Sequence, residues 1–222
     1  MTTTWISRAA RNNADWCAAM SRAHGITGDF GTDAWTSPLR TPLFYPDAVT
    51  LTPNADPAAL ITRIDAGPGA SVKDSFADLD LRPYGFDILF EAQWIHHPAT
   101  TPATTAPWTL VKDPATLHAW ATTWDNDNAE LFRPELLDDP DISVIAKTTP
   151  DGRIIAGAVL NQSEDVIGVS NIFAAEGDSP WPIALAAASG NPLVGYEHGE
   201  ALESAIAHGF KPVGPLRVWL RG

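Results

Sequence analysis

The last third of the chain constrains the fold most, because strand-like and helix-like segments alternate there at short spacing. An apolar strand is predicted over 166–173, a helix over 181–189, a short strand over 193–197, a second helix over 200–208 and a final strand ending near Leu220. This order predicts a βαβ crossover, in which the helix packs on the sheet between two parallel strands. We therefore expect a mostly parallel sheet core with a ligand cleft at the strand ends.

The composition indicates a folded globular protein and argues against several classes of partner. The 222 residues are enough for one large domain or two small ones, and the net charge is −13. Nucleic acid and anionic membrane surfaces both need a basic footprint, so neither is expected as a partner. No apolar run is long enough to span a bilayer, and residues 1–10 lack the apolar segment of a signal peptide, so a cytoplasmic protein is expected.

An α/β pattern is also predicted in the first half of the chain. A helix is expected over 9–24, a loop over 26–46 and a short strand over 47–51. Asp56 followed by Pro57 predicts a helix start, because aspartate caps a helix and proline suits its first position. Alternating apolar and polar residues over 86–94 predict a long strand.

A segment rich in proline, threonine and alanine, residues 98–107, is typical of a linker, since it contains no group able to anchor a core. It divides the chain into an N-terminal α/β lobe (1–97) and a C-terminal domain (108–222). Segments 49–60 and 108–117 both read as a strand followed by a helix opened by Asp-Pro. The N-terminal lobe is then either a degenerate copy of the C-terminal fold or only shares a common helix opener, which we favour slightly.

From residue 108 onward the predicted order is strand, helix, short helix, a meander of three antiparallel strands, helix, strand, helix, strand. This order resembles the GNAT superfamily of acyl-CoA-dependent N-acyltransferases over residues 107–222, about half of the chain. Its most specific piece is 201–210, ALESAIAHGF, similar to the helix and Gly-Phe stop that end the family's core. The resemblance implies an α+β fold with a mixed sheet, acetyl-CoA or another acyl-CoA as donor, and a small-molecule or peptidic amine as acceptor.

The chain departs from the family's pattern where the family binds pyrophosphate. The usual loop, a Gln or Arg followed by Gly-x-Gly or Gly-x-Ala, is replaced by AAEGDSP at 174–180. Acidic side chains oppose an anion there and prolines lack amide donors: Glu176, Asp178, Pro180 and Pro182. The tyrosine and asparagine that family members often carry fall at Ala205 and His198. These losses leave open a different class of function, a catalytically inactive GNAT-derived module that binds a ligand or another protein.

Candidate catalytic residues follow the predicted strand at 193–197. Glu197 could act as a general base toward an amine, with Tyr196 or His198 as the acid, because burial tunes the pKa of such groups. The structural alternative is that acidic residues here favour a helix N-terminus and Tyr196 fills core space. Glu91, on the polar side of the strand over 86–94, is a weaker alternative base.

Cofactor-binding residues are implied by the resemblance in the strand over 166–173. The family's sheet splays there, and the backbone of five residues would pair with the pantetheine arm: Val169, Ser170, Asn171, Ile172 and Phe173. A Ser-Asn pair in an apolar strand is unusual, because buried polar groups must find partners. A satisfied hydrogen-bond network in the core explains the pair equally well.

Two further features have ordinary structural explanations. The adjacent His96 and His97 face opposite ways on a strand, and the single Cys17 excludes a cysteine-based zinc site, so no metal is expected. Cys17 is expected to be buried and inert. Nine tryptophans predict a core with large rigid side chains. A third hypothesis is a structural protein that forms a homodimer through tryptophan-rich faces.

Overall fold

One mixed sheet runs through the residues that the computed structural model describes, 4–99 and 107–222. It contains eleven strands in the order β1-β2-β3-β4-β11-β5-β10-β9-β8-β7-β6. The strands are β1 (Asp29–Phe30), β2 (Ala34–Thr36), β3 (Ala48–Thr50), β4 (Ser71–Asp74), β5 (Phe86–His97), β6 (Thr109–Leu110), β7 (Ile142–Thr148), β8 (Ile154–Ser163), β9 (Val166–Ala174), β10 (Leu193–Glu197) and β11 (Lys211–Arg221). The α-helices are α1 (Trp5–Ala23), α2 (Pro57–Ile61), α3 (Pro114–Trp124), α4 (Trp181–Ala187) and α5 (Gly199–Ala207).

The predicted alternation of strands and helices at the C-terminus is confirmed, but the prediction of a mostly parallel sheet is wrong. Among the described strands only β3–β4 and β9–β10 pair in parallel. The strand β5, from the first half of the chain, lies between β10 and β11 and is antiparallel to both. The helix α5 therefore connects two strands that run in the same direction without pairing. The predicted α+β class with a mixed sheet is confirmed.

Local signals placed most elements in the first half, with shifts at their ends. The first helix begins at Trp5 rather than residue 9, because the Thr4 hydroxyl caps it by accepting from the Ser7 amide at 3.2 Å. The Asp56 cap of α2 is confirmed, with Oδ1 accepting from the Ala58 amide at 3.0 Å. The prediction of a loop throughout 26–46 is wrong, because β1 and β2 lie within it. These two strands are too short to show a periodicity.

In the second half, β7, β8 and β9 form the predicted antiparallel meander, and Asp113 caps α3 as expected. The short helix predicted before the meander consists of two 3₁₀ helices, η2 (Asn126–Leu131) and η3 (Pro134–Asp138). A third 3₁₀ helix, η1 (Arg82–Tyr84), precedes β5. Most of the predicted linker lies outside the described residues. Its two flanks contribute to one sheet, and the division into 1–97, 98–107 and 108–222 stays a prediction.

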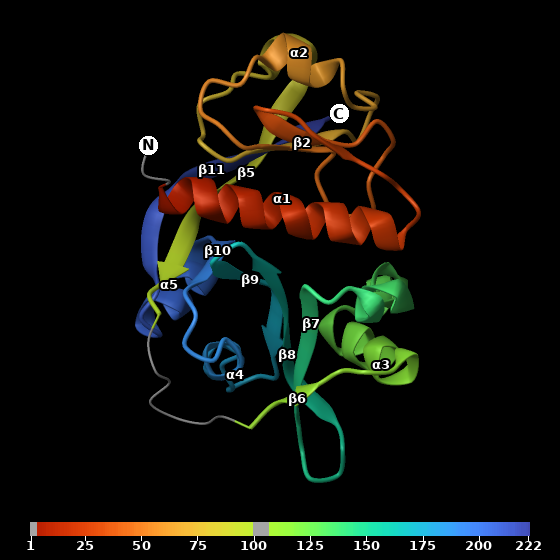
Figure 1. Ribbon diagram of the computed structural model, residues 1–222, viewed down its shortest axis with the longest axis vertical. Coiled ribbons are helices and arrows are strands. Elements are labelled where there is room, and N and C mark those ends of the chain that lie inside the picture. Colours follow the sequence, from red (N-terminus) through yellow and green to blue (C-terminus); the bar gives the residue numbers. More distant parts are fainter. Residues whose placement is uncertain (1–3, 100–106) are drawn as a thin grey trace.

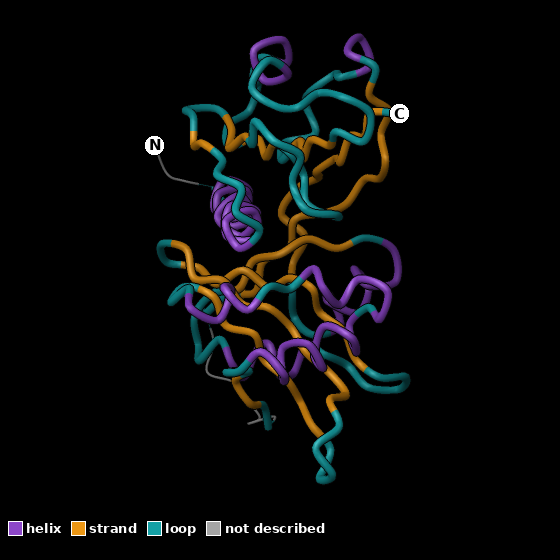
Figure 2. Tube along the Cα trace, turned by 90° about the vertical axis from the view of Figure 1, so that its right-hand side faces the viewer, coloured by secondary structure: helices purple, strands orange, loops and turns teal. Residues whose placement is uncertain are grey.

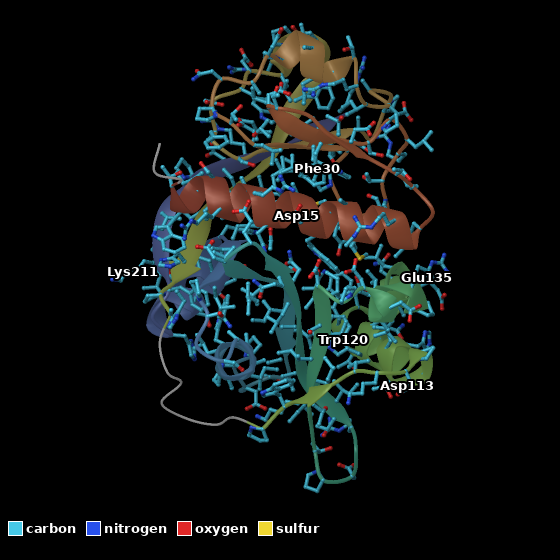
Figure 3. The ribbon with its side chains drawn as sticks, in the orientation of Figure 1. Asp15, Phe30, Asp113, Trp120, Glu135 and Lys211 are labelled. Atoms are coloured by element: carbon cyan, nitrogen blue, oxygen red, sulfur yellow. The ribbon has the colours of Figure 1, made fainter. Side chains whose placement is uncertain are left out.

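Helices cover the two faces of the sheet (Figures 1 and 2). On one face α1 crosses the middle of the sheet, and α3 packs beside it on β8 and β9. On the other face α4 packs on β7 and β8, and α5 on β10 and β11. Six of the nine tryptophans are buried, among them Trp120 between α3 and the sheet (Figure 3), which confirms the expected aromatic core. No described helix is long and apolar enough to cross a membrane.

A buried pair of asparagines fixes α1 against the second half of the chain. Asn12 Nδ2 donates to the Asn161 carbonyl and Asn161 Nδ2 donates to the Asn12 carbonyl, each at 3.0 Å. Gly168 on β9 makes room for the pair, since an added Cβ would collide with both side-chain amide oxygens. The helix is thereby held directly above the place where β9 and β10 meet.

Candidate functional site

The sheet opens between β9 and β10. The two strands pair only through Ile167 with Leu193 and Gly168 with Val194. Beyond these pairs β10 continues along β5, whereas β9 bends away along β8 with a bulge in which Asn171 adopts a positive φ of 47°. Along 169–174, that edge of β9 has no partner strand among the described residues.

A cavity of about 280 Å³, the cleft cavity, occupies this opening. Neighbouring residues on a strand point to opposite faces, so a cavity lined by both Tyr196 and Glu197 reaches both faces of the sheet. Six of the predicted site residues line it: Val169, Ser170, Asn171, Ile172, Tyr196 and Glu197. The structure therefore brings together the predicted base and four of the five predicted cofactor-binding positions.

Two predicted residues are not part of its lining. The Phe173 side chain turns into the core, with its ring centroid 5.2 Å from that of Trp120. His198 is exposed at the start of α5, and its ring lies 5.5 Å from that of Phe90. The proposed backbone role of Phe173 is unaffected by where its ring packs, whereas an acid at His198 would stand away from the cleft cavity.

Glu197 has the environment of a general base. Burial raises the pKa of its carboxyl group from 4.5 to about 7. Among the described residues no side chain pairs with this carboxylate, so desolvation alone causes the shift. A carboxyl group that is half ionised near neutral pH can accept a proton from a reacting amine and release it again.

Tyr45 is a cavity residue that sequence reasoning missed. Its hydroxyl donates to Asn171 Oδ1 at 3.2 Å, and its ring packs edge-on against Trp16. Burial raises the pKa of the Tyr45 phenol well above its usual value, so it keeps its proton at neutral pH. Tyr45 sits in a segment without periodicity, 26–46, and the sequence offers no signal for its position.

The buried Asp47 holds the loop that carries Tyr45. Its carboxylate accepts from the amides of Thr41 and Ser71, each at 2.9 Å, and pairs with Arg40 at 3.0 Å. Phe44, next to Tyr45, has a positive φ of 70°, which is unfavourable for a bulky side chain. The loop is thus fixed in a conformation that its own residues do not prefer.

Lys73 and Asn13 are also part of the cleft cavity and were also missed. Lys73, on β4, is only 3% exposed. Its Nζ donates to Asn13 Oδ1 at 2.8 Å and lies 4.0 Å from the centroid of the Tyr196 ring. The sequence did contain one signal for Lys73, a lysine inside a short strand of alternating residues. A lysine that such a strand buries needs a partner, because lysine is rarely buried without one.

The remaining polar groups of the cavity differ in how well they are satisfied. Asn171 is paired with Tyr45, but the buried Ser170 Oγ has no hydrogen-bond partner among the described residues. A fully satisfied core network therefore accounts for only half of the Ser-Asn pair. Cys17 is buried as expected, and burial raises its pKa to about 11, so its thiol is neutral and a poor nucleophile.

The segment 174–180 has the features that its sequence predicts to be unfavourable for binding a pyrophosphate. Asp178 is paired with Lys147 at 3.2 Å, so the nearby cation is already neutralised. The helix α4 that follows has Pro180 as its N-cap and Pro182 in its first turn, so two amide donors are missing there. Ala205 is fully buried in the core, so no side-chain acid occupies that place in α5.

Other candidate groups have structural partners. His96 stacks on Trp5 at 3.6 Å, and His97 packs beside Phe210. Glu91 pairs with Arg217 at 2.8 Å and does not line the cleft cavity, which weakens it as an alternative base. Within residues 4–99 and 107–222, no three His, Cys, Asp or Glu side chains cluster in a way that could hold a metal ion.

Comparison with solved structures identifies the fold. No family model matches the sequence, and no curated protein matches it. A GCN5-related N-acetyltransferase from Kribbella flavida is 14% identical with a TM-score of 0.65, covering 96% of this chain and 95% of its own. A GNAT-family protein from Novosphingobium aromaticivorans is 12% identical, with a TM-score of 0.59 over 96% and 99%. A functionally unknown conserved protein from Staphylococcus epidermidis is 11% identical, with a TM-score of 0.55 over 74% and 75%.

The chain therefore has a GNAT-like fold, as the order of its elements predicted. The similarity extends further than predicted, because a match over 96% of the chain includes most of the N-terminal half as well.

Proposed function

We propose that the protein transfers an acyl group from an acyl-CoA thioester to an amine. The observation that carries this proposal is the opening between β9 and β10. There an unpaired strand edge meets a cavity containing a carboxyl group with a pKa of about 7. The GNAT-like fold supports the same class of chemistry but does not by itself establish an activity.

The residues present fit the arm of an acyl-CoA better than its phosphates. The β9 edge from Val169 to Phe173 offers backbone groups to an extended pantetheine arm, and the unsatisfied Ser170 Oγ is available beside it. Gly195 keeps the gap open, since an added Cβ would lie 3.0 Å from the Val169 carbonyl oxygen. The pyrophosphate would have to bind near 174–180 with the help of backbone amides, because the Lys147 ammonium there is already paired with Asp178.

The side chains of the cleft cavity divide the proton transfers between them. When bound, the acyl-CoA supplies an acyl group activated as a thioester. Glu197 accepts a proton from the ammonium form of the acceptor, which frees the nitrogen lone pair for attack. The Tyr45 hydroxyl, which stays protonated, holds the proton that a departing thiolate requires, and the Tyr196 hydroxyl is a second source.

The acidic segment 174–180 favours a second candidate function, a GNAT-derived module that binds its ligand without turnover. The two hypotheses differ in whether the bound thioester is consumed. The enzyme should release free CoA in the presence of a suitable amine, whereas the binding module should show a saturable response and no CoA release.

Calorimetric titration of acetyl-CoA tests the proposal directly. We expect micromolar binding of acetyl-CoA to the wild-type chain, with dephospho-CoA as the control that lacks the 3′-phosphate. Gly195→Val, which places a side chain against the Val169 carbonyl, should abolish binding, with circular dichroism used to check that the variant is folded. No binding of acetyl-CoA up to millimolar concentration would refute the acyltransferase proposal.

A further inference from the structure

A second cavity adjoins the cleft cavity. This apolar cavity has a volume of about 580 Å³ and shares part of its wall with the cleft cavity: Phe44, Tyr45, Pro46, Lys73 and Tyr196. Its other walls are largely apolar and include Leu43, Leu89, Phe90, Val218 and Leu220. Its volume is in the range of small-molecule sites, about 300–1,000 Å³.

Lys73 is the unusual group in the shared wall. Its ammonium is almost fully buried, yet no carboxylate of the described residues lies within 4.0 Å of Nζ. Among residues 4–99 and 107–222, its close partners are one amide oxygen, from Asn13, and the face of the Tyr196 ring. A buried cation without a counter-ion is costly, and neutral partners compensate for that cost only in part.

The charges around the two cavities are complementary to a zwitterion. The apolar cavity contains no acidic side chain in its lining, and its other cation, Arg40, is already paired with Asp47. The cleft cavity has a single carboxylate in its lining, Glu197. Lys73 lines both cavities and Glu197 lines the cleft cavity, so a positive and a negative group face the cleft cavity beside the apolar one, within a chain of net charge −13.

We propose that these two adjoining cavities together bind an apolar α-amino acid. Its carboxylate pairs with Lys73, its amino group reaches Glu197 in the cleft cavity, and its side chain occupies the apolar cavity. The identification of this ligand as the acyl acceptor rests on the proposed function, whereas the binding itself does not. An amine without a carboxylate would leave Lys73 uncompensated and would therefore bind less well.

Binding of matched ligands tests this assignment without any need for turnover. The probes are L-leucine, L-leucinamide, which lacks the carboxylate, and N-acetyl-L-leucine, which keeps it, each titrated while intrinsic tryptophan fluorescence is recorded. Trp16 and Trp124 line the cleft cavity and supply the signal. We expect L-leucine to bind at least ~10-fold more tightly than L-leucinamide, which corresponds to about 1.4 kcal/mol.

The variant Lys73→Met should remove this preference and leave the affinity for L-leucinamide unchanged. It keeps the length of the side chain and removes a buried charge, so no loss of folding is expected. Lys211→Met is the matched control, because Lys211 is exposed at the periphery (Figure 3) and its loss changes the net charge equally. The control should bind all three probes as the wild type does.

Several outcomes would overturn the inference. Equal affinity for L-leucine and L-leucinamide would remove the carboxylate from recognition. If Lys73→Met still prefers L-leucine over L-leucinamide, a group other than Lys73 recognises the carboxylate. If a long-chain fatty acid binds and L-leucine does not, the apolar cavity is a site for an acyl chain. If acetyl-CoA binds but no amino acid does, this inference alone is overturned. If an amino acid binds through Lys73 but acetyl-CoA does not bind, only the proposed function is overturned.

Discussion

Replacing Glu197 by glutamine should inactivate the protein and at the same time stabilise it above neutral pH. The rise in pKa from 4.5 to about 7 means that the folded protein keeps a proton which the unfolded chain releases. The stability contributed by this protonated carboxyl group is therefore fully present below pH 4.5, falls as the pH rises and is lost above about pH 7. At ~1.36 kcal/mol per pKa unit, the loss is about 3 kcal/mol at most, since the side chain is only partly buried.

Glutamine stays neutral at every pH, so Glu197→Gln should escape this loss. Urea unfolding followed by tryptophan fluorescence should show its stability advantage over the wild type growing by about 2 kcal/mol between pH 5.5 and pH 8. Removal of the base should lower acyl transfer by about 10²–10⁴-fold. Glu203→Gln, an exposed change on α5, is the control and should change neither quantity. A stability difference that does not vary with pH would refute the assignment of a buried, proton-retaining carboxyl group.

Three further changes test the site and its support. Tyr45→Phe should slow CoA release and cost about 1 kcal/mol of stability, because Asn171 Oδ1 loses its donor; unchanged turnover would exclude Tyr45 as the acid. Gly168→Ala should destabilise the protein by about 1–3 kcal/mol in urea, since a Cβ there collides with Asn12 and Asn161; wild-type stability would disprove that tight contact. Residues 108–222 expressed alone should aggregate, because β10 and β11 lose β5 between them, and co-expression with 1–97 should rescue solubility; a stable monomer in size-exclusion chromatography would show that the C-terminal half folds independently.

Elements with local chemical signals could be predicted from the sequence. The Asp56 and Asp113 caps start their helices as expected, and Gly209 ends α5 with a positive φ of 92°. These features depend on a few neighbouring residues, so their physics is visible in a short window. The short strands β1 and β2 lack such a window and were missed.

Features that depend on distant contacts could not be predicted. The insertion of β5 between β10 and β11 joins residues that are 96 to 135 positions apart, and no local pattern encodes this pairing. The same reason explains the candidate site. Glu197 and Tyr196 were found because they end a strand, whereas Tyr45 and Lys73 reach the cavity only through tertiary packing.

The two halves of the chain contribute different parts of the candidate chemistry, and one packing arrangement produces both. The half after residue 107 supplies the strand edge and the carboxyl group, through β9 and β10. The half before residue 100 supplies the cover over them, with Trp16 on α1, Tyr45 in the loop held by Asp47, and Lys73 on β4. Without that cover Glu197 would be hydrated and its pKa would return toward 4.5, too low for an efficient base at neutral pH. The same contacts that bury Glu197, and so lower the stability of the protein, thus bring the Tyr45 hydroxyl and the Lys73 ammonium to the same cavity.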